Sequence, residues 1–181
     1  IQIFERIAGE PREMAIWNVS QIIEPQSVYT LSNPESPYKN SYIFHNKRES
    51  IQVDEDADNE ELLVTTFKPE GASKISFDSK HPVTVAKWER EGKDLFWVQR
   101  GVKDKKHSLK GSSIKTFGVE YYTQGKAKNN YVEMELMSPA FILKKDQPVT
   151  FTLFWSLHGD LDTSEVLSVL NGEGPDKQPD R

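Results

Sequence analysis

The sequence predicts an all-β fold, an antiparallel β-sandwich with at most one short helix near the C-terminus. Three observations support this prediction. Apolar and polar residues alternate with period two along much of the chain, turn-forming residues separate these runs at short intervals, and helical periodicity is almost absent. Many strands at short spacing are typical of a sandwich or barrel rather than of a parallel α/β fold.

The length of the chain favours one domain. Its 181 residues, 36% of them hydrophobic, suffice for a single core. We expect the sandwich over residues 1–158, a short helical segment over 159–172 and a disordered tail over 173–181. The chain begins at Ile1 without an initiator Met or a basic and apolar leader, so we expect a processed product or a piece of a longer chain.

The clearest strand signal is the segment Val149–Leu157. Every second residue from Val149 is Val, Phe, Leu, Trp and Leu, whereas the intervening positions are mainly Thr and Ser. We therefore expect a core strand whose buried side includes Trp155. Similar runs, rich in β-branched and aromatic residues, predict strands over residues 14–22, 61–68, 82–90, 95–102, 114–123 and 131–137.

A single helix is predicted near the C-terminus. Asp162 and Thr163 can cap its start, and Asn171 with Gly172 would end it. The helix would run over Ser164–Leu170. Its apolar stripe consists of Val166, Leu167 and Leu170.

Composition excludes several classes of function. The 23 basic and 28 acidic residues give a net charge of −5, which provides no general attraction to phosphate backbones, so we expect no nucleic-acid partner. The absence of cysteine excludes disulfides, thiolate zinc sites and cysteine nucleophiles; it is compatible with the bacterial periplasm or cell envelope, the location we favour, and with the cytosol. No apolar stretch approaches the ~18 residues of a spanning helix, and we expect no membrane insertion.

The sequence also lacks clear metal and cofactor motifs. Asp54, Asp56 and Asp58 have the spacing of a calcium loop, but Asn59 replaces the required glycine and Thr65 the required glutamate. We expect a solvated acidic loop over residues 54–61 and no metal. Nucleophile elbows, phosphate loops and dinucleotide-binding glycine motifs are absent, so we expect no cofactor.

Two carboxylates and one histidine are candidates for acid–base chemistry. Alternation over residues 131–137 directs Tyr131, Glu133 and Glu135 away from the core. Two neighbouring carboxylates raise each other's pKa, which suits a general acid or base; the alternative is an ordinary solvated strand face. Among the four histidines, His158 directly follows a predicted core strand, where clefts are commonly bordered by strand ends.

A second candidate surface lies in the strand predicted over residues 14–22. Trp17, Val19 and Gln21 share one side of it, and Asn18 and Ser20 the other. An indole ring packs against the apolar C–H face of a sugar, and amides satisfy hydroxyl groups as paired donors and acceptors. The pattern therefore favours a carbohydrate. The alternative is that the four tryptophans, Trp17, Trp88, Trp97 and Trp155, all belong to the core.

Three segments carry a resemblance to a known superfamily. The segment Tyr131–Pro139, the turn over residues 141–148 and the strand Val149–Leu157 resemble the closing section of galactose-mutarotase-like proteins. Together with Ala15–Gln21 and Lys74–Arg100, they look like an uncharacterised bacterial family of that superfamily. The likeness covers residues 1–157.

The resemblance implies a supersandwich of which this chain is the C-terminal portion. It implies that an N-terminal half is missing, or is replaced by a partner chain. Aldose mutarotases of the superfamily use a late glutamate as the base and an earlier histidine as the acid. Glu135 matches the glutamate by motif position, whereas the segment Met14–Val19, which corresponds to that of the histidine, contains none.

These observations give three functional hypotheses. The first is a carbohydrate-recognising, mutarotase-like sandwich whose ligand-binding residues are Trp17, Gln21, Arg100 and Glu133. The second is a sugar mutarotase or epimerase in which Glu135 removes the anomeric hydroxyl proton, while His158 or a residue of the missing half protonates the ring oxygen. The third is a structural or protein-binding sandwich without catalysis.

Overall fold

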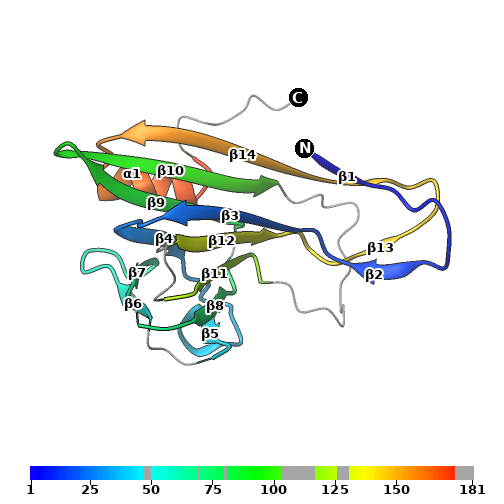
Figure 1. Ribbon diagram of the computed structural model, residues 1–181, viewed down its shortest axis with the longest axis horizontal. Coiled ribbons are helices and arrows are strands. Elements are labelled where there is room, and N and C mark those ends of the chain that lie inside the picture. The colour runs from blue at the N-terminus through cyan, green and yellow to red at the C-terminus, as the bar shows by residue number, and fades with distance from the viewer. Residues whose placement is uncertain (47–49, 69, 80, 103–116, 126–130, 174–181) are drawn as a thin grey trace.

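The computed structural model describes residues 1–46, 50–68, 70–79, 81–102, 117–125 and 131–173, and it confirms the all-β class (Figure 1). The strands of its sheets pair antiparallel. One α-helix is described, α1 (Thr163–Leu170), together with a 3-10 turn at Lys39–Ser41. Among these residues, no helix has the length and hydropathy that crossing a membrane requires.

The described strands form two main sheets and a small ribbon. The larger sheet has, in spatial order, β1 (Gln2–Phe4), β14 (Val149–Gly159), β10 (Lys93–Val102), β9 (Val83–Arg90), β4 (Ser27–Leu31), β7 (Leu62–Phe67) and β6 (Ile51–Glu55). The smaller has β3 (Trp17–Ile23), β12 (Tyr131–Met137), β11 (Val119–Thr123), β8 (Ser73–Phe77) and β5 (Tyr42–Phe44). The ribbon pairs β13 (Phe141–Leu143) with β2 (Arg12–Met14).

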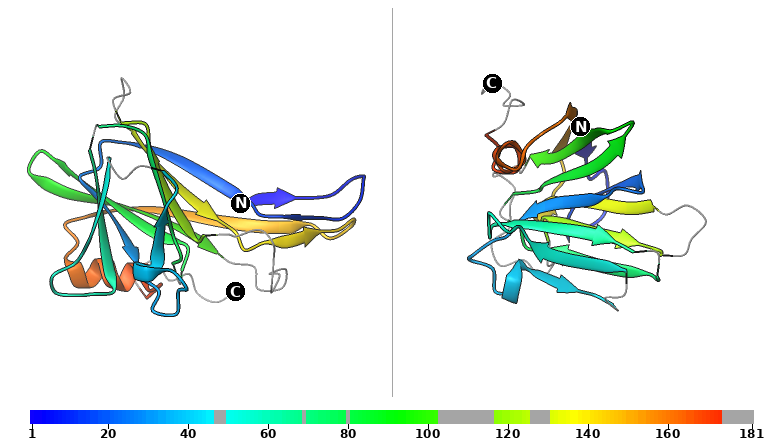
Figure 2. Two further views of the ribbon diagram at one scale, coloured as in Figure 1. Left: turned by 90° about the horizontal axis from the view of Figure 1, so that it is seen from below. Right: turned by 90° about the vertical axis from the view of Figure 1, so that its left-hand side faces the viewer.

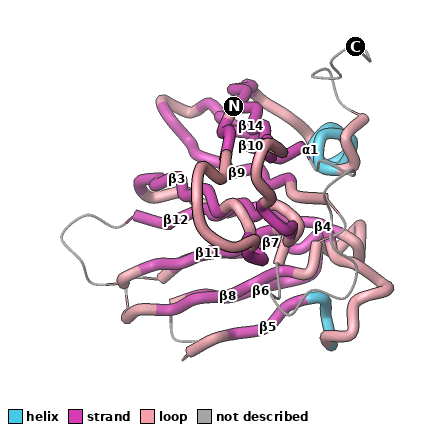
Figure 3. Tube along the Cα trace, turned by 90° about the vertical axis from the view of Figure 1, so that its right-hand side faces the viewer, coloured by secondary structure: helices cyan, strands magenta, loops and turns pink. Residues whose placement is uncertain are grey.

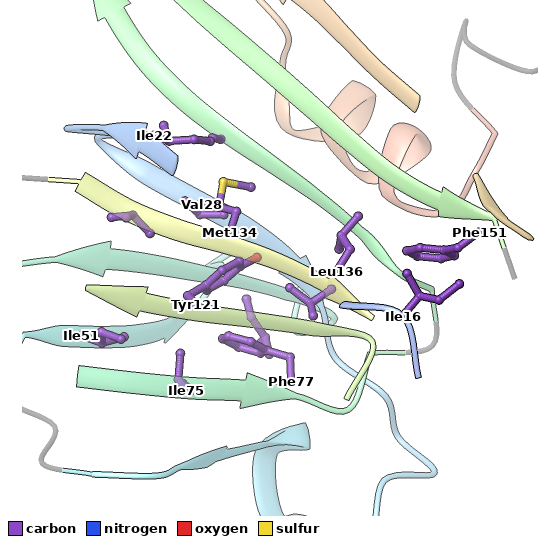
Figure 4. Close-up of a cluster of buried hydrophobic side chains, with 14 of the residues drawn as sticks. Ile16, Ile22, Val28, Ile51, Ile75, Phe77, Tyr121, Met134, Leu136 and Phe151 are labelled. Atoms are coloured by element: carbon purple, nitrogen blue, oxygen red, sulfur yellow. The ribbon is translucent and has the colours of Figure 1, made fainter. Parts of the chain in front are cut away.

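The main core lies between the two sheets. Side chains of β12, β11 and β8 that point inward meet residues of β14, β4 and β6 (Figure 4). This cluster includes Ile22, Val28, Ile75, Phe77, Tyr121, Met134, Leu136 and Phe151, all of them buried. Because alternate residues of a strand point to opposite faces, the remaining residues of β3, β12, β11 and β8 point away from this core.

A second apolar cluster covers the other face of the larger sheet. There α1 contacts β4 and β9 (Figure 2). The Asp162 side chain accepts a hydrogen bond from the Glu165 backbone N–H, and the Glu165 side chain accepts one from the Asp162 N–H, which forms a capping box. The helix thus begins one residue before the predicted start and ends at the predicted residue. Its buried residues are Val166, Val169 and Leu170.

The sequence located the long strands but not the short ones. Six predicted runs overlap β3, β7, β9, β10, β12 and β14, although β3, β10 and β14 extend one or two residues beyond the predicted bounds. Strand β11 falls within the run predicted over residues 114–123, of which 114–116 lie outside the described residues. The predicted acidic loop is partly wrong, because Asp54 and Glu55 belong to β6. The predicted tail beyond residue 173 also lies outside the described residues.

One prediction about the core is wrong. Val149 and Phe151 are buried, as expected, but Trp155 and Leu157 are each 65% exposed. The alternation correctly places them on the same face of β14 as Phe151. However, the smaller sheet does not reach far enough to cover that end of the strand, since β3 is its edge (Figure 3).

The turn at Gly125 gives a test of the packing between two turns. Gly125 has a positive φ of 68°, and a Cβ there would collide with the backbone of Gly71. We expect Gly125→Ala to lower the free energy of unfolding by about 2 kcal/mol or more. Gly92→Ala is the matched control, because Gly92 has a similar φ of 73° but open space around it; we expect a loss of roughly 1 kcal/mol there. Equal losses in denaturant unfolding would contradict the predicted clash.

Candidate functional site

The outward face of the smaller sheet collects most of the polar candidates. We call this surface the outer face, and it consists of Trp17, Val19, Gln21, Lys74, Ser76, Glu120, Tyr122, Glu133 and Glu135. The strand register places Glu135 between Val19 of β3 and Glu120 of β11, and Glu120 lies opposite Ser76 of β8. Directly opposed residues lie close enough for their side chains to interact.

Glu135 is the most deeply buried carboxylate of the outer face. Only 1% of the residue is exposed. Its Oε2 atom accepts a hydrogen bond from the Trp17 indole Nε1 at 2.9 Å and another from the Lys74 ammonium at 2.8 Å. The predicted direction of Glu135 is therefore correct, but its carboxylate is covered by neighbours rather than open to solvent.

Lys74 joins Glu135 to a second carboxylate. Its Nζ atom lies 2.8 Å from Oε2 of Glu120 and 2.8 Å from Oε2 of Glu135, so that one ammonium is held between two carboxylates. Glu120 is also buried, and its Oε1 atom accepts a hydrogen bond from the Ser76 hydroxyl. Buried charges persist only where such partners compensate the loss of hydration.

This arrangement shifts the pKa values of its members in opposite directions. Burial raises the pKa of Glu135 to about 7; the hydrogen bond from Lys74 opposes this rise, and proximity to Glu120 adds to it. Burial also acts to raise the pKa of Glu120, but hydrogen bonds from Lys74 and Ser76 outweigh it and lower that pKa. The pKa of Lys74 is raised, because its bonds with the two carboxylates outweigh burial. Near neutral pH, Glu120 is thus ionised, and Glu135 is the carboxyl group that gains or loses a proton.

Trp17 is exposed yet held in one orientation. Of the residue, 55% is accessible to solvent. Its indole N–H is used by Glu135, and the Lys74 ammonium lies 5.3 Å from the ring centroid, a cation–π distance. The ring therefore offers an apolar surface while its polar atom is already satisfied.

An amide and a carboxylate lie on the same face as Trp17. Gln21 and Glu133 are opposed across β3 and β12, and the Gln21 amide donates to Glu133 Oε1 at 3.0 Å. This bond uses one amide hydrogen and one carboxylate oxygen. The other carboxylate oxygen, the amide oxygen and the second amide hydrogen provide both acceptors and a donor at a solvent-accessible position.

His45 extends the network at the far side of the sheet. Its Nε2 atom forms a hydrogen bond with the Ser76 hydroxyl and lies 3.9 Å from Oε1 of Glu120. Hydrogen bonds and ion pairs thus connect six polar or aromatic side chains in one row, in the order His45, Ser76, Glu120, Lys74, Glu135 and Trp17. Four of these six residues, namely His45, Lys74, Ser76 and Glu120, were not predicted from the sequence.

The structure does not bring His158 or Arg100 to the outer face. His158 lies within β14, not after it, and points to the same side of the larger sheet as Phe96 and α1. The Arg100 guanidinium donates to the backbone oxygen of Val169, the second-last residue of α1. Both residues thus lie on the opposite surface of the sandwich from Glu135. They form no common site with Trp17, Gln21 and Glu133.

In the described part of the chain, no group of three or more His, Asp or Glu residues is arranged to hold a metal ion.

Comparison with known proteins does not identify the chain. No family model, curated protein or solved structure matches it.

The raised pKa of Glu135 makes stability depend on pH. The folded state binds this proton more tightly than the unfolded state, where the pKa is near 4.5, so stability falls as pH rises from 4.5 to about 7. Between these values the contribution changes by about 3 kcal/mol at most. Glu135→Gln should remove this slope in denaturant unfolding measured across pH. An unchanged slope would show that the Glu135 pKa is not raised.

Lys74 should be more important for stability than other lysines in ion pairs. In Lys74→Met two buried carboxylates lose their shared cation, and we expect a loss of about 3–5 kcal/mol near neutral pH. The matched control is Lys87→Met, because Lys87 forms a single ion pair with the more exposed Asp94 at 2.6 Å; we expect a loss of about 1 kcal/mol or less. Similar losses in the two variants, measured by denaturant unfolding, would contradict the bridging role of Lys74.

Proposed function

We propose that the outer face binds a carbohydrate, with Trp17 as its stacking platform. The observation that carries this proposal is an exposed indole ring, held in place by Glu135 and Lys74, on the same face as the Gln21–Glu133 pair. Because the ring is held before a ligand arrives, little side-chain freedom is lost on binding.

The chemistry of the face matches a polyhydroxylated ligand. The C–H groups on one side of a pyranose ring pack on an indole, and its hydroxyls need donors and acceptors at close spacing. Gln21 and Glu133 supply both kinds of group, four residues along β3 from Trp17, a separation of about 13 Å. Val19 lies between Trp17 and Gln21 along β3 and is also exposed, so it extends the apolar part of the surface.

The resemblance to galactose-mutarotase-like proteins supports the same ligand class. It is carried by the motifs around Glu135 and by the order of strands that follows them. An all-β sandwich is compatible with one portion of a supersandwich. We propose on this basis that the chain belongs to that superfamily and works in a bacterial envelope.

Sugar mutarotation or epimerisation with Glu135 as the general base is the second candidate function. The pKa of about 7 favours it, because a base works best when its pKa is near the working pH. Burial opposes it, since a base must come within hydrogen-bond reach of the ligand hydroxyl and Oε2 of Glu135 already accepts two bonds. We therefore assign Glu135 the role of positioning Trp17.

Binding measurements with matched tryptophan variants test the proposal. We expect calorimetry or a glycan array to detect binding of a neutral oligosaccharide that Trp17→Ala weakens by about tenfold or more. Trp155→Ala is the control, because Trp155 is at least as exposed but lies on a different sheet; it should leave the affinity unchanged. Equal effects of the two substitutions, or no binding across a broad sugar panel, would overturn the proposal.

Glu135→Gln separates the two candidate functions. The amide keeps an oxygen that accepts the Trp17 N–H, so binding should be largely retained if Glu135 only positions the ring. Anomer interconversion followed by polarimetry or NMR would be lost if Glu135 were the base. We expect no catalysed interconversion in either protein, and an activity that Glu135→Gln abolishes would establish the enzyme instead.

A further inference from the structure

Both sheets of the sandwich end on the same side. In the smaller sheet the edge is β3, and in the larger sheet β14 is the last long strand. Strand β3 contacts β10 and β9 across the core, because Gln99 donates to the Asn18 side chain and the Trp88 indole donates to the backbone oxygen of Ile23. Strand β14, which follows β10 in the larger sheet, therefore extends beyond the edge formed by β3 (Figure 3). We call this the open side.

Among the described strands, β1 alone lies along the outer edge of β14, and it covers that edge only in part. Strand β1 pairs with residues Val149–Phe151, and no other described strand lies along that edge from Thr152 to Gly159. On its inner edge the same segment pairs with β10 over its whole length. An eight-residue stretch of strand thus borders the open side.

The segment Thr152–Gly159 lacks the features that protect strand edges. It contains no Lys, Arg, Asp, Glu or Pro, although 28% of the chain is charged. Natural proteins commonly place Lys or Pro on open edges to prevent pairing with another chain. The composition of this segment therefore favours pairing with a further strand.

Large apolar side chains lie along this edge. Trp155 and Leu157, each mostly exposed, point to the core-facing side of the larger sheet, in line with Phe151 and Leu153. In the neighbouring strand, Trp97 lies opposite Leu157 and packs partly against the main core. Exposed apolar residues that continue a core mark an interaction surface.

We propose that the open side binds a second copy of this chain through antiparallel pairing of the two β14 strands across a two-fold axis. In such an interface the same segment meets itself, so its charge pattern must be self-complementary. Thr152–Gly159 meets this condition because its lack of formal charges avoids like-charge repulsion, although the whole chain carries a net charge of −5. Trp155 and Leu157 of both copies would then cover one another beside a continuous sheet.

This inference is independent of sugar binding. Trp17 points away from the core, whereas Trp155 and Leu157 point toward it. A dimer through β14 thus leaves the indole ring of Trp17 in solvent, and Trp17→Ala should not change the oligomeric state.

Sedimentation velocity across a concentration series tests the dimer. We expect the wild type to reach about twice the 20.8 kDa of one chain. Trp155→Lys and Leu157→Lys, which bring like charges together at the interface, should each weaken dimerisation by about tenfold or more. Ile7→Lys is the control, since Ile7 is 87% exposed outside the strands, and it should leave dimerisation unchanged. A wild type that stays monomeric at every concentration overturns the inference.

Cross-linking provides a second measurement that does not depend on the lysine variants. The chain has no cysteine, so single substitutions at Phe154, Trp155, Ser156 and Leu157 to Cys each introduce the only thiol. Pairing across a two-fold axis predicts that one of these positions forms the intermolecular disulfide much faster than the others. Uniform rates along the series, or rates equal to that of Ile7→Cys, would overturn the proposed strand pairing.

Discussion

The arrangement of the outer face depends on one ammonium group, that of Lys74, held between the carboxylates of Glu120 and Glu135. Both carboxylates are buried, and neither could remain so without a cation or a proton. Lys74 supplies the positive charge, and Glu135, whose pKa is raised to about 7, takes up a proton as pH falls to 7 and below. The exposed ring of Trp17 is then fixed through Glu135, so the proposed ligand binding and the stability of the fold depend on the same group.

The strand order explains why these residues meet. Trp17, Lys74, Glu120 and Glu135 come from β3, β8, β11 and β12, which are adjacent in the sheet although their sequence separations reach 118 residues. Alternation alone fixes which side of each strand carries the polar residues. The register then aligns the two carboxylates, and burial makes their electrostatic interaction strong.

The sequence predicted the parts of this site that depend on one strand at a time. It placed Trp17 with Gln21 and Glu133 with Glu135 on outward-facing sides, because alternation is a local property. It missed Lys74, since β8 was not recognised, and Glu120, whose role depends on being paired with Glu135 across strands. The prediction that Trp155 is buried is wrong, because alternation identifies the face of a strand but not whether another sheet covers that face. His158 and Arg100 were likewise assigned without knowledge of which surface their strands present.

The most direct test of the account is the side-chain NMR signal of the Trp17 indole N–H, assigned with Trp17→Phe and followed during titration with a neutral oligosaccharide. The account predicts that this signal shifts with saturation while the indole signal of Trp155 stays unchanged. Shifts at Trp155 with none at Trp17, or no shift at either ring, would contradict a carbohydrate-binding outer face.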